Sequence, residues 1–231
     1  MAARTRRGTA VKLLAMAKID AARTRQATAG PGRPKPVKRL EPSDHQVRIV
    51  GGRWKRSRLP VANKSGLRPT PDRVRETVFN WLGQDLSGWS CLDAFAGTGA
   101  LGFEAASRGA TAVTLVENDR ELVLQLAASK ERLGADMVQI HRGDGVAAMA
   151  RLPARSLDLV FLDPPFDANL FEPALRAAAG VIRPTAFVYL EAPVAWTDAM
   201  LGAWGLTVVR HLKAGAVHAH LLQISGQPPH A

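Results

Sequence analysis

Cysteine is nearly absent from the sequence, and long apolar runs are missing altogether. The single cysteine, Cys91, excludes a disulfide framework and a cysteine-rich zinc site, and it is compatible with a reducing cytosol. No apolar stretch approaches the ~20 residues that a membrane-spanning helix needs. Membrane, collagenous and small secreted classes are therefore excluded, and we expect a cytoplasmic protein with no membrane partner.

Acidic residues are scarce in the first third of the chain. Residues 1–78 contain 20 Lys and Arg residues but only 5 Asp and Glu residues. The whole chain of 231 residues contains 31 Lys and Arg residues and 20 Asp and Glu residues. A basic front half on a mildly acidic body favours a polyanionic partner, nucleic acid first. For the first 45 residues alone, a tail that charge keeps in solution is the alternative.

Composition divides the chain into three expected parts. Residues 1–45 contain the run PGRPKPVKRLEP and show no apolar period, which predicts a disordered basic arm. An organelle transit peptide has a similar composition and stays open as an alternative. Residues 46–66 read as a basic hairpin extension. The hydrophobic fraction of the whole chain, 46%, is typical of a globular protein, and we expect its core in the remainder, 67–231.

The hairpin is predicted from the alternation in Val47–Val50, the pair Gly51-Gly52 and a return over Arg53–Val61. After it, Thr70-Pro71-Asp72 is typical of a helix start, with a capping hydroxyl and a proline at the first helical position. The apolar spacing that follows marks the buried face of this helix: Val74, Val78, Trp81 and Leu82. Basic side chains line both elements and are our candidates for binding RNA: Arg48, Arg53, Lys55, Arg56, Arg68, Arg73 and Arg75.

From Ser90 onward, apolar strands alternate with helices. The expected strands are 91–96, 112–117, 138–141, 157–162 and 186–191, and the expected helices are 100–108, 120–133, 145–150 and 169–179. The segments 206–211 and 217–224 are typical of a closing antiparallel pair. This order predicts a Rossmann-like α/β fold, a doubly wound and mostly parallel seven-stranded sheet with an antiparallel C-terminal strand. Its ligand crevice should lie at the carboxyl ends of the strands.

A glycine-rich turn follows the first of these strands. Gly97, Gly99 and Gly102 have the spacing G-x-G-x-x-G between a strand and a helix, where glycine allows a sharp turn and close approach to a ligand. Glu117, at the end of the next strand, is placed to accept both hydroxyls of a ribose. Together they indicate a cofactor that contains a nucleoside.

Two acids favour S-adenosylmethionine over a nicotinamide dinucleotide. Asp93 lies at the end of the first strand, where a carboxylate can meet a methionine ammonium but would repel a pyrophosphate. Asp144 follows the third strand and can accept a hydrogen bond from an adenine amine. Each also has a purely structural alternative, Asp93 as a stabiliser of the turn and Asp144 as a helix N-cap.

The most specific segment is Asp163-Pro164-Pro165-Phe166, after the fourth strand. Two prolines end the strand, because they lack backbone donors, and hold the chain extended and rigid. Asp163 and the Pro164 carbonyl can each accept one hydrogen of an exocyclic base amine, while Phe166 offers a face on which the base can stack. We therefore assign the catalytic role to Asp163, Pro164 and Phe166.

These motifs resemble those of class I S-adenosylmethionine-dependent amino-methyltransferases. The segments VRIVGG (47–52) and GLRPTPDRVRETVFN (66–80) are similar to the signatures of the RsmD-like bacterial enzymes. The resemblance implies methylation of the N2 amine of guanine 966 in 16S ribosomal RNA, within an assembling small subunit. It also implies the set of cofactor-binding residues, namely Asp93, Phe95, Gly97, Gly99, Glu117, Asn118, Asp144 and Gly145.

Three other functions stay open on the sequence. A DNA methyltransferase acting on adenine N6 or cytosine N4 would use the same corner, but no separate target-recognition domain is evident. An NAD-dependent oxidoreductase would use the glycine turn, and a non-catalytic RNA-binding assembly factor would use neither. We expect a monomer without a metal, and we interpret His218 and His220 as structural because a third ligand is lacking.

Overall fold

The computed structural model describes residues 46–64, 70–166 and 168–226. The predicted basic arm, residues 1–45, and the predicted RNA-binding residue Arg68 lie outside the described residues. No helix in the described part of the chain is long and apolar enough to cross a bilayer.

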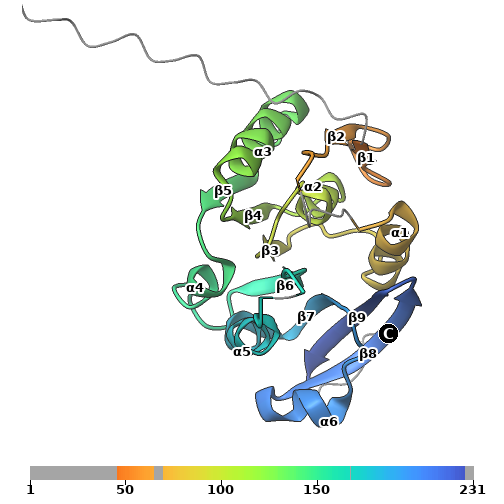
Figure 1. Ribbon diagram of the computed structural model, residues 1–231, viewed down its shortest axis with the longest axis vertical. Coiled ribbons are helices and arrows are strands. Elements are labelled where there is room, and N and C mark those ends of the chain that lie inside the picture. The colour runs from red at the N-terminus through yellow and green to blue at the C-terminus, as the bar shows by residue number, and fades with distance from the viewer. Residues whose placement is uncertain (1–45, 65–69, 167, 227–231) are drawn as a thin grey trace, which may run out of the picture. The chain divides into compact units, whose positions relative to one another are not determined.

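A seven-stranded sheet organises the fold, in the order β5-β4-β3-β6-β7-β9-β8 (Figure 1). The five strands from β5 to β7 run parallel, whereas β9 pairs antiparallel with both β7 and β8. The strands span Ser90–Asp93 (β3), Ala112–Glu117 (β4), Val138–Arg142 (β5), Leu157–Leu162 (β6), Ile182–Ala192 (β7), Leu206–Ala214 (β8) and Val217–Ile224 (β9). The predicted fold class is confirmed, and the reversal of order between β3 and β6 creates the switch point at which such sheets bind ligands.

Helices cover both faces of the sheet. The side chains of α1 (Asp72–Trp81), α2 (Ala100–Ser107) and α3 (Arg120–Leu133) enter one apolar cluster. Those of α4 (Gly145–Met149), α5 (Phe171–Val181) and α6 (Asp198–Leu201) enter the other. Because both faces are covered, the central strands read as continuous apolar runs such as LDLVFL in β6.

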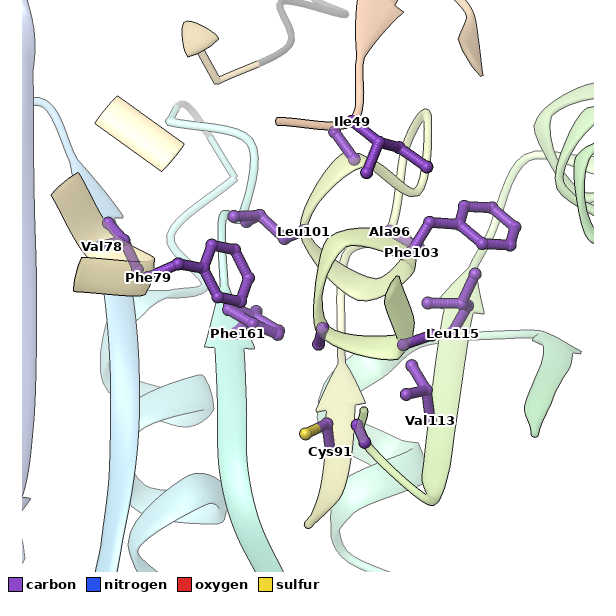
Figure 2. Close-up of a cluster of buried hydrophobic side chains, with 14 of the residues drawn as sticks. Ile49, Val78, Phe79, Cys91, Ala96, Leu101, Phe103, Val113, Leu115 and Phe161 are labelled. Atoms are coloured by element: carbon purple, nitrogen blue, oxygen red, sulfur yellow. The ribbon is translucent and has the colours of Figure 1, made fainter. Parts of the chain in front are cut away.

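The first cluster joins α1 and α2 to the sheet (Figure 2). Phe79 of α1 packs on Phe161 of β6 with ring centroids 6.0 Å apart, and Phe161 meets Tyr189 of β7 edge-on at 6.0 Å. Cys91 lies in the same cluster with 1% of its surface exposed, and burial raises the pKa of its thiol. The cysteine is therefore a core residue.

The N-terminal hairpin is shorter than predicted. Its strands are β1 (Gln46–Arg48) and β2 (Arg58–Pro60), paired antiparallel. The segment between them, 49–57, is a turn in which the Ile49 N–H donates to the Ser57 carbonyl and the Arg56 N–H donates to the Ile49 carbonyl, both at 2.8 Å. The predicted return strand over 53–61 is wrong at its start, because residues 53–56 form turns and Arg56 has a φ of 72°.

The start of α1 also differs from expectation. Thr70 does not cap the helix; its hydroxyl donates instead to Glu191 Oε1 at 2.5 Å, and Pro71 occupies the N-cap position without a side-chain bond. Other elements shift by a few residues at their ends. α5 begins at Phe171 instead of 169, after Asn169 with a φ of 51°, and β7 begins at Ile182 instead of 186.

Candidate active site

Four carboxylates gather at the carboxyl edge of the sheet. Asp93 and Glu117 end β3 and β4, Asp163 follows β6, and Glu191 is the penultimate residue of β7. Since β4, β3, β6 and β7 are parallel neighbours, these ends meet along one line of the sheet. The glycine turn and the Asp-Pro-Pro-Phe corner leave from the adjacent strands β3 and β6, so the structure brings the two predicted motifs together.

The glycine turn needs its glycines for backbone geometry and for space. Gly97 and Gly99 have φ values of 52° and 78°, in the left-handed region that side chains disfavour. A Cβ at Gly102 would lie 2.1 Å from Leu115 Cδ2, so this glycine lets α2 approach β4. Asp93 Oδ2 accepts the Gly102 N–H at 3.0 Å, which ties the first turn of α2 to β3.

Asp93 is almost fully enclosed, with 1% of its surface exposed. Burial raises the pKa of its carboxyl to about 7, and the charges of Glu117 and Glu191 act in the same direction. The described structure thus gives Asp93 the role of holding the turn. Direct contact with a cofactor stays a prediction.

Glu117 is fixed by the loop that it faces. Its Oε2 accepts the Gly97 N–H at 2.8 Å and its Oε1 accepts the Asp119 N–H at 2.9 Å, while the residue stays half-exposed. Each carboxylate oxygen carries two lone pairs, so both oxygens retain acceptor capacity for ribose hydroxyls. Asn118 beside it is exposed, and Phe95 of the turn is half-exposed.

Asp144 acts as the N-cap of α4, because its Oδ1 accepts the Ala147 N–H at 2.7 Å. The side chain is nevertheless exposed, and within the described part of the chain its other oxygen accepts no hydrogen bond. Gly145 lies so close to β3 that an added Cβ would be 2.0 Å from the Ala94 carbonyl oxygen. This close contact holds the segment after β5 against the start of the glycine turn.

The Asp-Pro-Pro-Phe corner combines a partly buried acid with an exposed aromatic ring. Asp163 is half-buried and Pro164 buried, whereas 42% of Phe166 is exposed. Phe166 contacts Phe171 at the start of α5 with centroids 6.1 Å apart, and that ring contacts Trp196 at the same distance. Burial and the charges of Glu191 and Asp93 raise the pKa of Asp163 well above its ordinary value.

Glu191 is a site residue that the sequence interpretation missed. Only 3% of it is exposed, and its Oε1 accepts hydrogen bonds from the Thr70 hydroxyl at 2.5 Å and the Tyr189 hydroxyl at 2.8 Å. The available signal was an acid that ends the apolar run FVYL in the strand beside the corner.

The predicted RNA-binding residues divide into two groups. Arg48, Arg53, Lys55, Arg56 and Arg73 are exposed, as phosphate binding requires. Arg75 is a correction, because it is fully buried and its guanidinium donates to Glu104 at 3.1 Å and to Asp72 at 2.6 Å. A cation with no exposed surface cannot contact RNA, so Arg75 is a structural residue.

The histidines of β8 and β9 form a stack beside the site. His220 is buried and its Nε2 accepts the Trp196 N–H at 3.0 Å, a structural contact. His211 Nε2 lies 2.9 Å from His218 Nδ1. Within the ranges that the structure describes, no group of three or more His, Cys, Asp or Glu side chains is arranged to hold a metal ion.

The residues at the edge fit S-adenosylmethionine by their donor and acceptor types. Glu117 offers carboxylate oxygens held in place by two backbone amides, and Asp144 offers an exposed oxygen one strand further on. These acceptors suit the hydroxyls and amine of an adenosine. A dinucleotide would place its pyrophosphate at the glycine turn, beside Asp93, where a carboxylate opposes it.

Comparison with known proteins agrees with this geometry. A family model described as "Conserved hypothetical protein 95" matches residues 47–223. The Ribosomal RNA small subunit methyltransferase D of Escherichia coli (strain K12) is 41% identical over 151 residues, which cover 64% of this chain and 76% of that protein. The chain belongs to the RsmD family.

Further similarities support this membership. The protein of the same name from Haemophilus influenzae is 42% identical over 153 residues, covering 63% of this chain and 78% of that protein. The solved structure of yhhF from Escherichia coli superposes with a TM-score of 0.68 at 38% identity, covering 79% of this chain and all of that one. As an RsmD family member, the chain has the class I methyltransferase fold, and the nicotinamide alternative loses its support.

Proposed function

We propose that the protein transfers a methyl group from S-adenosylmethionine to the exocyclic N2 amine of a guanine in small-subunit ribosomal RNA. The observation that carries this proposal is the junction of β3 and β6. Ala94 N–H donates to the Phe161 carbonyl at 3.1 Å, so the glycine turn and the Asp163 corner leave the sheet side by side. The names of the relatives support ribosomal RNA as the substrate class.

The cofactor supplies a methyl group on a positively charged sulfur, which makes that carbon an electrophile. An aromatic amine is a weak nucleophile, because its lone pair is delocalised into the ring. Asp163 accepts one amine hydrogen and the Pro164 carbonyl the other, which turns the lone pair toward the methyl carbon. Orientation of this kind and stabilisation of the charge that develops on nitrogen are the main sources of rate.

Phe166 selects a planar substrate. Its ring is 42% exposed at the end of the corner, and stacking of a base on such a ring contributes about 1–3 kcal/mol. A guanine that is unpaired or flipped out of a helix can reach this position, which a base inside a duplex cannot. The exposed cations Arg53, Lys55 and Arg56 of the hairpin turn would hold the flanking phosphates.

The test is methylation of RNA by the full-length chain with labelled S-adenosylmethionine, followed by nucleoside analysis. We expect N2-methylguanosine, in free small-subunit RNA or in isolated small subunits, which are assayed in parallel. Label in N6-methyladenosine or in a cytosine nucleoside would refute the guanine assignment, and no label in either substrate would refute the activity.

The role of the corner is tested with Asp163→Ala. Turnover should fall by orders of magnitude while affinity for S-adenosylhomocysteine, which lacks the transferred methyl group and the positive charge, changes little, because Asp163 is assigned to the amine. The matched control is Glu131→Ala, which removes an exposed acid of α3 and should leave turnover unchanged. Parallel loss of S-adenosylhomocysteine affinity and turnover in Asp163→Ala would contradict the assignment.

A further inference from the structure

Glu191 stands directly beside Asp163. Leu162 and Leu190 are the last paired residues of β6 and β7, Asp163 is the residue that follows β6, and Glu191 is the next residue of β7. Phe161 and Tyr189 lie two positions before Asp163 and Glu191, and their rings contact each other on the face of the sheet that α1 covers. Since side chains alternate along a strand, Asp163 and Glu191 project from that same face.

The carboxylate of Glu191 is enclosed without a bonded cation. Its two hydrogen bonds, from Thr70 and Tyr189, both end on Oε1, and within the described residues Oε2 accepts none. The charge of Arg75 lowers the pKa of Glu191, but the guanidinium donates its hydrogen bonds to the Thr70 and Arg48 carbonyls, Glu104 and Asp72. Within the described residues, the two acids therefore lack a directly bonded counter-ion.

Charged and titratable groups face this pair from every side of the edge. They are Arg75 of α1, Tyr189 of β7 and Asp93 of β3, which itself faces Glu117 of β4. Burial raises the pKa of both acids, the charge of Glu191 raises the pKa of Asp163 further, and the donors Thr70 and Tyr189 act against the rise at Glu191. Two carboxyl groups this close titrate as one unit, in which the first proton leaves more readily than the second.

We infer that Glu191 and Asp163 form a proton-sharing pair, which loses a proton when a cationic cofactor binds and regains one from the methylated amine. The inference rests on the proposed function for the identity of the amine. In the reaction, the amine nitrogen bonds to the methyl carbon and the carbon–sulfur bond breaks with its electron pair left on sulfur. One N–H bond of the amine then breaks, and its proton passes to Asp163. The positive charge of the sulfonium disappears in the reaction, and the pair gains a proton.

This pairing makes Glu191 a positioning residue that acts through Asp163. Before the cationic cofactor binds, the negative charge of Glu191 keeps a proton on Asp163. After methyl transfer, the same charge favours the return of a proton from the methylated amine to Asp163. The hydroxyls of Thr70 and Tyr189 hold Glu191 in the orientation that makes this possible. A purely structural Glu191 would have no proton exchange linked to the charge of the cofactor.

The experiment compares binding of S-adenosylmethionine and S-adenosylhomocysteine, which differ by one methyl group and one positive charge. Binding heats are measured near pH 7.5 with the full-length chain, in buffers of low and high ionisation enthalpy. We expect about half a proton or more to be released with S-adenosylmethionine in excess of S-adenosylhomocysteine. In Glu191→Gln, which keeps an acceptor oxygen for both hydroxyls, the excess should fall to less than half of its wild-type value.

Asp163→Asn should also remove the excess release, because it leaves Glu191 without a partner, and Glu131→Gln should retain it. S-adenosylhomocysteine affinity and melting temperature confirm that each variant is folded. Equal release with both ligands in the wild type would overturn the inference. A full excess in Glu191→Gln would also overturn it, and the result for Asp163→Asn would then assign the proton to Asp163 alone or to Asp93. N2-methylguanosine formed without excess release would refute this inference alone, whereas excess release with a different methylated nucleoside would refute only the guanine assignment.

Discussion

Replacing Glu104 by glutamine tests how the hairpin and α1 are held on the domain. The Glu104 carboxylate is fully buried and accepts four hydrogen bonds, which come from three different elements. The donors are the Val50 and Gly51 amides at 2.8 and 2.7 Å, Arg75 at 3.1 Å and Arg108 at 2.9 Å. Glutamine has the same shape, but it carries no charge and turns a donor toward these donors.

The expected loss follows from the burial of both partners. Removing one member of a buried ion pair costs about 3–5 kcal/mol, because the other charge is left uncompensated. Asp72 remains as a second partner of Arg75, so we place the loss near the lower end, at about 3 kcal/mol. Domains of this size shift in melting temperature by roughly 2–4 °C per kcal/mol, which predicts a fall of roughly 6–12 °C.

Urea unfolding followed by circular dichroism measures this loss, with Glu131→Gln as the exposed control. Arg75→Met completes a double-mutant cycle, and the two single losses should exceed the loss of the double variant by about 1–3 kcal/mol. A loss below about 1 kcal/mol for Glu104→Gln, or strict additivity in the cycle, would refute the reasoning that Arg75 is a buried structural cation.

Two further predictions concern the RNA surface and the buried acid. Changing Arg53, Lys55 and Arg56 together to glutamine should weaken RNA binding and reduce the slope of log affinity against log salt by roughly 2–3. Lys213→Gln, at another exposed lysine, is the control. An unchanged slope in the triple variant would mean that RNA binds elsewhere on the protein. Asp93 has a folded-state pKa of about 7 against an ordinary 3.8, so the native state holds a proton that the unfolded state lacks, and stability falls as pH rises between about 4 and 7. In Asp93→Asn, up to roughly 4 kcal/mol of this fall in stability should be absent. The measurement is the free energy of unfolding of the wild type and the variant as a function of pH. Identical pH dependence in the two proteins would contradict the raised pKa of Asp93.

The sequence interpretation succeeded where a pattern has one physical reading. Strand, glycine turn and helix in order define the cofactor edge, and two prolines after a buried strand must end it, so the Asp163 corner was placed correctly beside the glycine turn. The range 120–133 of α3 was predicted to the residue, because Asp119 caps its start and Gly134 ends it.

It failed where a charged residue occupies an apolar position. Arg75 was assigned to RNA from its charge, yet its spacing to Val78, Phe79 and Leu82 puts it on the buried stripe of α1. Glu104 within ALGFEAAS and Glu191 after FVYL carry the same signal. Glu104, the acid that pairs with buried Arg75, lies 29 residues away along the chain, and only the fold brings the two together.

Enclosure of Cys91 has a practical consequence for following this protein in solution. Its thiol is 1% exposed and its pKa is raised, so the reactive thiolate is scarce and alkylating reagents should not reach it. A cysteine introduced at exposed Ala168, two residues past Phe166, would then be the sole thiol that reacts. A fluorophore attached there would sense the arrival of RNA at the corner without any change to the native core.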